Sequence, residues 1–371
     1  MTSNFIYIDD ASEETIASLV DAVVGDRESV GIEYVPVREF EDLMSTINAA
    51  AKRDCGFILD WRLDQLANID GKTATYKAAA LAQEMRSRGA EGVIPERPII
   101  LWSTDDKLQN SFFADHTSHD LFDLVHHKDQ LVDDAGRVRL ELVEAFSAYV
   151  LAAKTRSASV EEALATSESV LSRCDVRFID TAIRARSGSI HDWLRFVFKQ
   201  VVRVRGVLVD EELLAATLGV DSQRSDDWNP LLDLLPDDSR YRGPFSRAWK
   251  RWWGRQIIQG WWKVVSSGAG SLLSLTAQER CRILVEFTGL QNLVPSEPIL
   301  PTYSARFSTI CLATSCPLDV VDGVQVIGHE LQPWQDREYV CLDAALRGTY
   351  KDKSLRLHPS EIARVKELRS Q

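Results

Sequence analysis

The sequence predicts an α/β fold at the start of the chain, a doubly wound parallel sheet of five strands, followed by a mainly α-helical region and a small α+β module. Two observations predict the sheet. Apolar runs of strand length alternate with segments of helical period, the order of a parallel sheet covered by helices. Two of these runs, residues 5–8 and 57–59, end abruptly in acids, namely Asp9 with Asp10, and Asp60. Carboxyl ends of parallel strands meet at one edge of a sheet, so these acids are expected to lie together.

Local signals along residues 1–153 place the individual elements. Ser12 can cap a helix that opens with Glu13 and Glu14 and that Gly25 ends. The later helices are expected where apolar residues recur every three or four positions, and the strands where short apolar runs are continuous. In chain order, the further elements expected are a strand at 32–37, a helix at 40–51, a strand at 57–60, a helix at 75–88, strands at 98–102 and 121–125, and a helix at 138–153.

Composition limits the class of protein. The chain of 371 residues is 45% apolar, lacks the run of about 18 apolar residues that a membrane helix needs, and has no charged-then-apolar leader. Six scattered cysteines do not form the dense framework of a secreted domain. We therefore expect a cytoplasmic protein with reduced thiols. The net charge of −12 is unevenly distributed, because residues 1–150 hold 28 acidic and 14 basic side chains. We therefore expect residues 1–150 and residues 151–371 to face different partners.

The strand-end acids favour a divalent cation. Carboxylates held close together repel one another unless a cation lies between them, and oxygen ligands of this kind suit Mg2+. Ser103 and Thr104 follow the strand at 98–102, where a hydroxyl can donate to a phosphoryl oxygen. Lys128 follows the strand at 121–125, where its ammonium group can pair with a phosphate. This set of residues predicts a phosphorylatable switch.

The order Asp9–Asp10, Asp60, Ser103, Lys128 resembles the receiver domain of two-component response regulators. The resemblance covers roughly the first 150 residues. It implies that Asp9, Asp10 and Asp60 bind Mg2+ and that Asp60 accepts a phosphoryl group from a histidine kinase. It also implies that Ser103 and Lys128 sense that group. No catalytic constellation appears in the remainder, so the chain is not expected to be an enzyme.

Several positions depart from the receiver pattern. Asp129 follows Lys128 where receivers usually have a proline, and His126 stands at the aromatic switch position. Asp60 is followed by Trp-Arg-Leu-Asp and a long loop in place of a short turn. The alternative is a pseudo-receiver, in which the acids are solvated strand-end groups and no phosphate is carried.

Residues 154–294 are expected to form a helical, tryptophan-rich domain with a linker. One helix is predicted over 158–172 and another over 190–209, with Gly206 as a candidate break. The segment 239–278 carries seven Lys or Arg residues, no acid and five of the ten tryptophans. A single helix there would place apolar residues on one stripe. The stripe consists of Trp249, Trp253, Ile257 and Trp261.

Nucleic-acid binding and protein packing are both open for this basic, aromatic segment. Nucleic-acid binding would use the cations on phosphates and the rings for stacking, and residues 213–232 have the look of a helix-turn-helix. However, Asp226 and Asp227 lie on the second helix, and acids there oppose DNA. We favour packing in a core or against a partner, because aromatic anchors dominate protein interfaces. The acidic receiver-like domain of the same chain is another candidate target for the basic face.

Residues 295–371 are predicted to form the small α+β module. Its last helix opens near Pro359. Four residues could supply zinc ligands, but the usual close Cys-x-x-Cys pair is absent and buried thiols are the preferred interpretation. These residues are Cys311, Cys316, His329 and Cys341. The strands are expected at 307–312, 324–327 and 338–342.

The sequence as a whole predicts a response-regulator-like signalling protein whose receiver-like domain controls protein–protein association, with a homodimer among its forms. A receiver-regulated, DNA-binding transcription regulator is one alternative. A zinc-stabilised scaffold that never takes phosphate is the other. Atypical receivers fused to other modules also resemble components of bacterial anti-phage defence systems, which adds an expectation of that biological role.

Overall fold

The computed structural model describes residues 2–25, 29–66, 71–113, 117–268, 270–327 and 331–370. Its internal contacts divide the chain into two compact units, each made of separate segments. Unit 1 comprises Met1–Leu164, Thr181–Lys199 and Arg242–Trp249, and unit 2 comprises Ala165–Asp180, Gln200–Tyr241 and Lys250–Gln371. The division into domains at 1–153, 154–294 and 295–371 stays a prediction.

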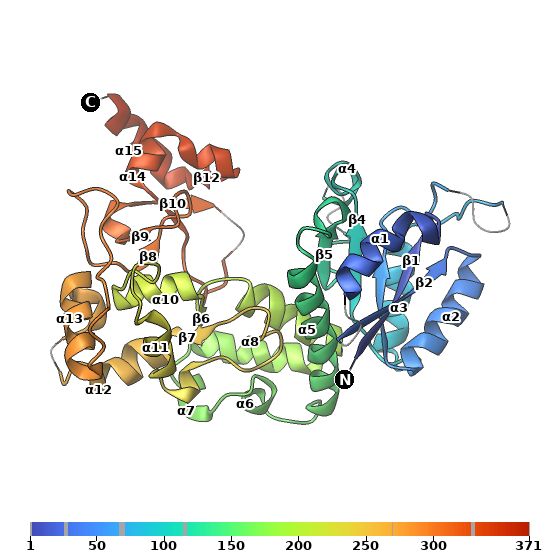
Figure 1. Ribbon diagram of the computed structural model, residues 1–371, viewed down its shortest axis with the longest axis horizontal. Coiled ribbons are helices and arrows are strands. Elements are labelled where there is room, and N and C mark those ends of the chain that lie inside the picture. Colours follow the sequence, from blue (N-terminus) through green and yellow to red (C-terminus); the bar gives the residue numbers. More distant parts are fainter. Residues whose placement is uncertain are drawn as a thin grey trace. The chain divides into compact units, whose positions relative to one another are not determined.

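Unit 1 is built on a five-stranded parallel sheet with the order β2-β1-β3-β4-β5 (Figure 1). Every position of β3 and β4 is buried, as expected for strands covered on both faces. The strands are β1 (Ser3–Asp9), β2 (Val30–Pro36), β3 (Cys55–Leu59), β4 (Ile99–Ser103) and β5 (Leu124–His127). The doubly wound α/β fold predicted from the sequence is confirmed.

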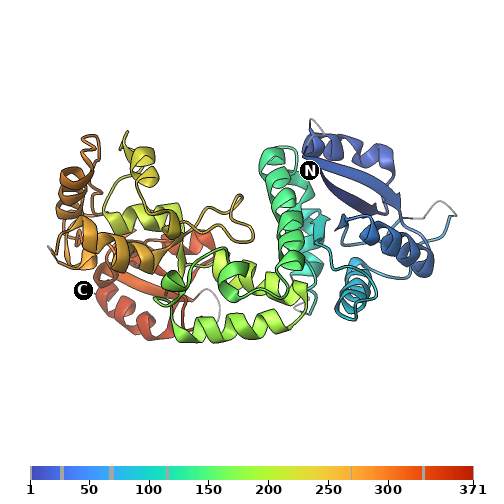
Figure 2. The same cartoon turned by 90° about the horizontal axis from the view of Figure 1, so that it is seen from below.

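Helices cover both faces of this sheet. The four long ones are α1 (Glu13–Val24), α2 (Phe40–Lys52), α3 (Ala78–Ala90) and α5 (Ala135–Lys154) (Figure 2). Alternate residues of β1 point to opposite faces. Phe5 contacts Phe146 of α5, with ring centroids 6.1 Å apart, whereas Ile6 and Ile8 join the core that includes α2 and α3. Ser12 caps α1 as predicted.

Two later segments complete unit 1. The short helix α9 (Ile190–Phe196) packs on α5, and the carboxylate of Glu96 accepts the backbone N–H groups of Ile190 at 2.7 Å and His191 at 2.9 Å. In the second segment, the side chain of Arg247 pairs with the buried carboxylate of Glu144 on α5. One cation of the basic segment 239–278 therefore pairs with an acid of the receiver-like domain.

The helical region contains shorter elements than the sequence predicts. The prediction of one helix over 158–172 is wrong. The segment contains two helices of four residues each, α6 (Val160–Ala163) and α7 (Glu168–Leu171). Ala165, between them, has a left-handed backbone with φ of 48°, which a helix cannot contain. The helix expected over 190–209 is shorter than predicted. After α9 it continues only as the π-helix η3 (Val197–Val202) and then gives way to the strand β6 (Leu208–Val209).

The tryptophan-rich segment is not a single helix. It forms β7 (Trp252–Trp253), which pairs with β6, then the π-helix η5 (Gln256–Trp261) and the short helix α12 (Trp262–Val265). The interpretation of the tryptophans as core residues is nevertheless confirmed for four of the five, which are buried in unit 2. These are Trp252, Trp253, Trp261 and Trp262.

The segment with the look of a helix-turn-helix is packed into unit 2. Its first helix, α10 (Glu211–Leu218), ends at Gly219 with φ of 74°, and its second helix, α11 (Trp228–Asp233), has only six residues. Asp227, one of the two acids noted on that helix, immediately precedes it and accepts the backbone N–H of Asn292 at 2.7 Å. A nucleic-acid role for this segment stays a prediction.

The helix α8 (Val176–Ser187), which the sequence did not predict, contributes its first residues to unit 2 and the others to unit 1. The helix α13 (Ala277–Thr288) belongs to unit 2. The chain ends in the small α+β module that was predicted. Its three-stranded antiparallel sheet has the order β11-β10-β12. Its elements are β8 (Thr309–Ile310), β9 (Pro317–Leu318), β10 (Gly323–Ile327), β11 (Tyr339–Cys341), α14 (Leu342–Arg347), β12 (Arg356–Leu357) and α15 (Pro359–Ser370).

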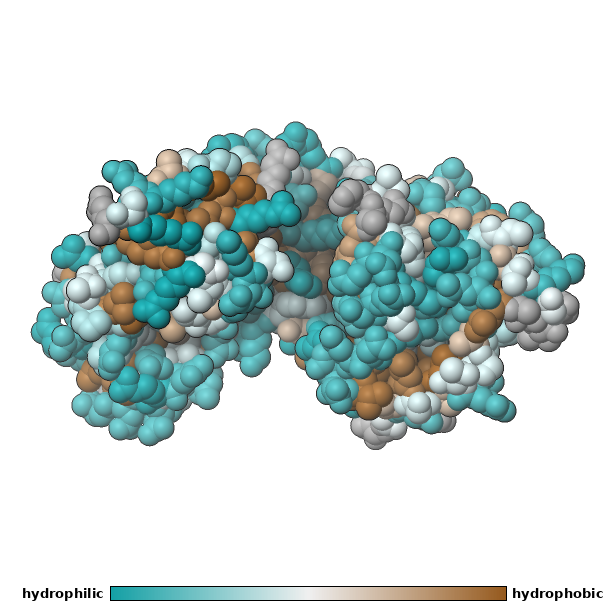
Figure 3. Space-filling view, turned by 90° about the horizontal axis from the view of Figure 1, so that it is seen from above, coloured by the Kyte–Doolittle hydropathy of each residue, from teal (hydrophilic) through white to brown (hydrophobic). Residues whose placement is uncertain are grey.

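Within the described ranges, no helix has both the length and the apolar composition needed to cross a bilayer. The face drawn in Figure 3 is mostly hydrophilic, and its hydrophobic residues gather in a few patches.

Candidate functional site

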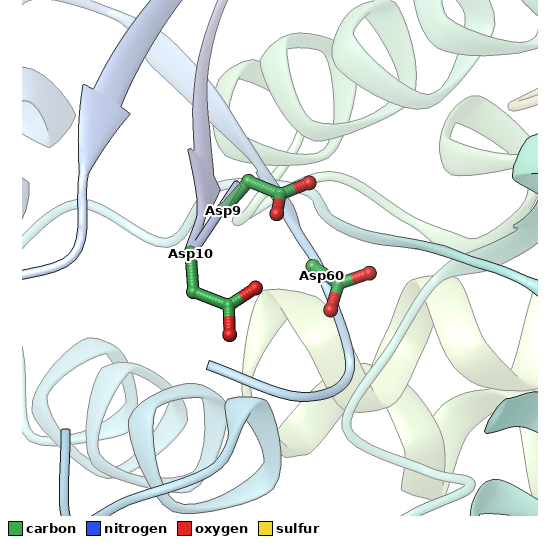
Figure 4. A group of neighbouring side chains, drawn as sticks. All are labelled: Asp9, Asp10 and Asp60. Carbon is green, nitrogen blue, oxygen red and sulfur yellow. The ribbon is translucent and has the colours of Figure 1, made fainter. Parts of the chain in front are cut away.

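The three predicted metal ligands come together at the carboxyl ends of β1 and β3. Asp9 ends β1, Asp10 follows it, and Asp60 follows β3. Because β1 and β3 are neighbours paired in parallel, both strands end at the same edge of the sheet. One carboxylate oxygen from each acid lies within 4.8 Å of the others, and Figure 4 shows the three side chains converging.

Lys128 and Ser103 reach the same point from the next two strands. The ammonium nitrogen of Lys128, directly after β5, lies 2.6 Å from Asp9 Oδ2 and 2.6 Å from Asp60 Oδ1. The hydroxyl of Ser103, which ends β4, donates to Asp60 Oδ1 at 3.3 Å. Thr104 begins the next turn, and in the described part of the chain no hydrogen bond joins its hydroxyl to the three acids.

A second ammonium group, which the sequence reading missed, also lies at the site. Lys107 ends the three-residue helix α4 (Asp105–Lys107), and its nitrogen lies 3.1 Å from Asp60 Oδ2. The only sequence signal was a cation shortly after a strand end. The position of that cation depends on how the chain turns after β4, and no periodicity encodes the turn. Three carboxylates thus face two ammonium groups, which leaves one negative charge in excess.

The pKa values of Asp9 and Asp10 shift in opposite directions. Burial alone would raise the pKa of Asp9, but the charge and hydrogen bond of Lys128 outweigh burial and lower it. Burial raises the pKa of Asp10, and the neighbouring Asp60 and Asp9 add to that rise. Burial would lower the pKa of Lys128, but Asp60 and Asp9 raise it. Lys128 therefore holds Asp9 ionised, whereas Asp10 carries the unfavourable excess charge.

The long loop after Asp60 folds back over the acids. Asp10 Oδ2 accepts the backbone N–H groups of Gln65 at 2.9 Å and Leu66 at 2.8 Å, and Asp60 Oδ2 accepts that of Arg62 at 2.9 Å. These N–H groups stabilise carboxylate oxygens that would otherwise lie close together without donors. The loop that departs from the receiver pattern is thus part of the site, as far as Leu66, where the described stretch ends.

The residues fit the predicted Mg2+ site. All three candidate ligands are carboxylates, Asp10 is only half-buried, and the excess negative charge favours a cation. Among the described residues, no other group of three His, Cys, Asp or Glu side chains lies this close together. Bound there, Mg2+ would supply positive charge next to a phosphoryl oxygen.

Aromatic residues connect the site to the segment after β4. Trp61, which follows Asp60, is buried and donates its indole N–H to Ser111 at 2.9 Å in the π-helix η1 (Leu108–Phe112). Its ring packs edge-on against Phe112, with centroids 5.2 Å apart. His126, at the predicted aromatic switch position, is buried, with Nε2 3.6 Å from Glu141 of α5.

The predicted zinc ligands lie in the C-terminal module. Cys311 and Cys341 are buried in its core, and the backbone N–H of Cys341 donates to the Cys311 sulfur at 3.1 Å. Cys316 is partly exposed, and His329 lies outside the described residues. The burial of Cys311 and Cys341 agrees with the buried-thiol interpretation, while the zinc alternative stays a prediction.

Unit 1 contains a second acid-centred cluster at the opposite, amino-terminal edge of the sheet. Asp123 precedes β5, has a side chain only 5% exposed, and accepts the guanidinium of Arg86 at 2.8 Å and the hydroxyl of Tyr149 at 2.9 Å. His191 of α9 lies 3.0 Å from the same hydroxyl. Burial would raise the pKa of Asp123, but the charge of Arg86 and then His191 lower it far below its usual range. We call these four residues the Asp123 cluster.

The sheet order 2-1-3-4-5 and the acid, hydroxyl and lysine positions at its carboxyl edge are those expected of a receiver. The first unit contains a receiver-like domain. No protein-family model and no curated protein matches this sequence.

Two solved structures are similar to the chain at low scores. An adenylate cyclase from Rhodopirellula baltica gives a TM-score of 0.29 at 9% identity, covering 43% of this chain and 100% of that one. The Legionella pneumophila response regulator LqsR gives 0.27 at 11% identity, covering 64% and 76%. The receiver-like assignment rests on the sheet order and the site.

Proposed function

We propose that this chain is a response-regulator-like signalling protein in which Asp60 accepts a phosphoryl group at a Mg2+ site. The observation that carries the proposal is the convergence of Asp9, Asp10, Asp60, Ser103 and Lys128 at one sheet edge. A pseudo-receiver with solvated acids is the alternative. Against it stands the burial of Asp60 and Ser103, both 0% exposed, and of Asp9 at 1%.

The proposed chemistry is transfer to a carboxylate oxygen. An oxygen of Asp60 attacks the phosphorus of a phosphohistidine or of a small acyl phosphate. The bond between phosphorus and the donor breaks, its electron pair leaves with the donor, and an aspartyl phosphate forms. Ser103 can donate a hydrogen bond to the new phosphoryl oxygens, and Lys128 can pair with their charge. Mg2+ held by Asp9, Asp10 and Asp60 would neutralise charge during the transfer.

A connected set of contacts supports a route from Asp60 to η3, directly after α9. Lys107 pairs with Asp60 and immediately precedes η1, where Phe112 packs on Trp61. The carbonyl of Phe112 lies 2.9 Å from His119 Nε2, and the carbonyl of His119 accepts the ammonium group of Lys199 at 2.9 Å. A change of charge at Asp60 would alter the Lys107 contact first. We place the output in the segments that follow α9.

The output proposed is protein–protein association, with a histidine kinase as phosphoryl donor and homodimerisation as one form. The remainder of the chain would act by binding and not as an enzyme. The defence role expected from the resemblance, and the DNA-binding and zinc-scaffold alternatives, stay predictions, because no observation on the described residues favours them.

Acetyl phosphate tests the proposal directly. The purified full chain, incubated with acetyl phosphate and Mg2+, is expected to gain the mass of one phosphoryl group, measured by intact mass spectrometry. Asp60→Asn should abolish the gain, and removal of Mg2+ with a chelator should suppress it.

Asp64→Asn is the matched control, since Asp64 lies in the same loop but pairs with Arg62 at 2.6 Å. This variant should still be phosphorylated. No mass gain in the parent with acetyl phosphate or phosphoramidate, or an equal gain in Asp60→Asn, would contradict the proposal.

A further inference from the structure

Lys107 gives the site a feature that the receiver resemblance does not predict. Each oxygen of the Asp60 carboxylate faces its own ammonium group, because Lys128 lies 2.6 Å from Oδ1 and Lys107 lies 3.1 Å from Oδ2. The Lys107 side chain is 23% exposed, against 13% for Lys128. Lys107 is therefore the more exposed of the two ammonium groups.

The backbone around Lys107 is anchored from both sides. Before it, the N–H of Asp105 donates to Asp129 at 3.0 Å, and the Asp105 carboxylate lies 3.1 Å from His127 Nδ1. After it, Leu108 and Phe112 are buried in the core of the domain. Because the neighbouring residues are anchored in this way, pairing of the lysine costs less backbone freedom than it would on a mobile loop.

A cation at Asp60 Oδ2 acts differently before and after phosphorylation. Before it, the ammonium group neutralises one of the carboxylates that a divalent ion would need, so it opposes Mg2+. After it, the phosphoryl group brings additional negative oxygens to Asp60, and a lysine is a common point-charge ligand of phosphate. The same side chain thus disfavours the metal in the resting site and favours the phosphoryl group in the modified site.

We propose that Lys107 is a second phosphoryl-binding residue, which clamps the group on Asp60 opposite Lys128 and weakens Mg2+ binding to the unmodified site. This inference rests on the proposed function, because it assigns a role in the same phosphoryl site. It concerns binding equilibria and requires no turnover to be measured.

Calorimetric titrations of the full chain test the inference in two steps. Mg2+ alone is titrated first, and beryllofluoride, a stand-in for the phosphoryl group, is titrated at saturating Mg2+. Lys107→Met keeps the length of the side chain and removes its charge. It is expected to tighten Mg2+ binding by about two- to fivefold, the scale of one partly exposed charge, and to weaken beryllofluoride binding by at least as much.

Two further variants isolate the charge of Lys107. Lys107→Arg keeps the charge, so its dissociation constants for Mg2+ and for beryllofluoride should lie close to the parent values. Lys52→Met removes a lysine from the exposed end of α2, next to the start of β3 at the opposite edge of the sheet, and should change neither constant. Circular dichroism of each variant verifies the fold.

Each result bears on a different claim. Opposite shifts of the two constants in Lys107→Met support the inference. Unchanged constants, or equal weakening of both, in a folded variant would overturn it while leaving the proposed function intact. A parent chain that binds neither Mg2+ nor beryllofluoride would overturn both.

Discussion

The two acid-centred clusters of the receiver-like domain lie at opposite edges of one sheet and contain similar groups. They differ in how completely positive groups and hydrogen-bond donors balance their acids. At the amino edge, the side chain of Asp123 is buried and matched by Arg86, Tyr149 and His191. At the carboxyl edge, three carboxylates face two ammonium groups, and Asp10 remains half-buried with a raised pKa. The first cluster is satisfied by the chain itself, whereas the second retains an unneutralised charge.

The difference indicates which cluster stabilises the fold and which can bind a ligand. A buried acid with a full set of donors contributes to stability only while its partners are present. An acid-rich group near solvent is unfavourable to the folded chain by itself and gains from a cation. Substitutions that remove one group at one edge of the sheet separate these two roles.

Loss of Asp123 should have the largest effect. Asp123→Asn leaves the buried guanidinium of Arg86 without its counter-charge, so the free energy of unfolding should fall by about 3–5 kcal/mol. Urea denaturation followed by circular dichroism measures this. Asp120→Asn is the control, because the Asp120 side chain is 60% exposed and its ion pairs should contribute at most about 1 kcal/mol. A similar loss of unfolding free energy in both variants would contradict the larger contribution expected of the buried ion pair.

Asp10→Asn should weaken Mg2+ binding without harming the fold. Losing one of three ligands is expected to raise the Mg2+ dissociation constant by about tenfold or more, equivalent to about 1.4 kcal/mol. Because the pKa of Asp10 is raised in the folded chain, its ionised form disfavours folding at neutral pH, so the variant should be equally or more stable. Calorimetry measures the Mg2+ affinity, and denaturation measures the stability. A destabilised variant with unchanged Mg2+ affinity would mean that Asp10 stabilises the fold and does not bind Mg2+.

Acid should destabilise the chain partly through Asp123. Its pKa is lowered on folding, so its contribution is complete above the unfolded value of about 4 and is lost as the pH falls toward the folded value. One such group changes stability by up to about 1.4 kcal/mol per pH unit. Denaturation between pH 5 and about pH 3 should therefore show a shallower decline for Asp123→Asn than for the parent. Parallel profiles would mean that folding does not lower the pKa of Asp123.

The smallest effect is expected at the hydrogen bond between Trp61 and Ser111. Ser111→Ala should lower the free energy of unfolding by about 1 kcal/mol, the typical value of one such bond. If η1 transmits the charge change at Asp60, the variant should still be phosphorylated by acetyl phosphate but change its self-association less on phosphorylation. Analytical ultracentrifugation with and without beryllofluoride measures the self-association. An unchanged response would remove η1 from the proposed route.

Sequence reasoning located the receiver-like domain because its signals are local. Ser12 and Gly25 mark the ends of α1, and apolar runs that stop at Asp9 and Asp60 mark the strand ends. Parallel pairing brings those ends to one edge of the sheet, so the amino-acid sequence is sufficient to group the acids with the hydroxyl and the lysine of the site. The residues grouped in this way are Asp9, Asp10, Asp60, Ser103 and Lys128.

The features that the sequence did not predict depend on tertiary packing, which no local pattern encodes. The Trp249 to Trp261 stripe has helical period, yet Trp252 and Trp253 pair as a strand with β6, because tertiary pairing overrides periodicity. Lys107 reaches Asp60 only through a three-residue helix that leads into a π-helix. The Asp123 cluster joins residues of three helices to the residue before β5, and their separation in sequence, 63 positions between Arg86 and Tyr149 alone, hides it.

A crystal structure of the chain with Mg2+ and beryllofluoride tests the central claim most directly. The account predicts Mg2+ among the carboxylates of Asp9, Asp10 and Asp60, with direct oxygen ligands at about 2.1 Å. It also predicts beryllofluoride on Asp60, within hydrogen-bonding distance of Ser103 and Lys128. A beryllofluoride adduct on another residue, or an unmodified Asp60 with the metal bound elsewhere, would contradict the account.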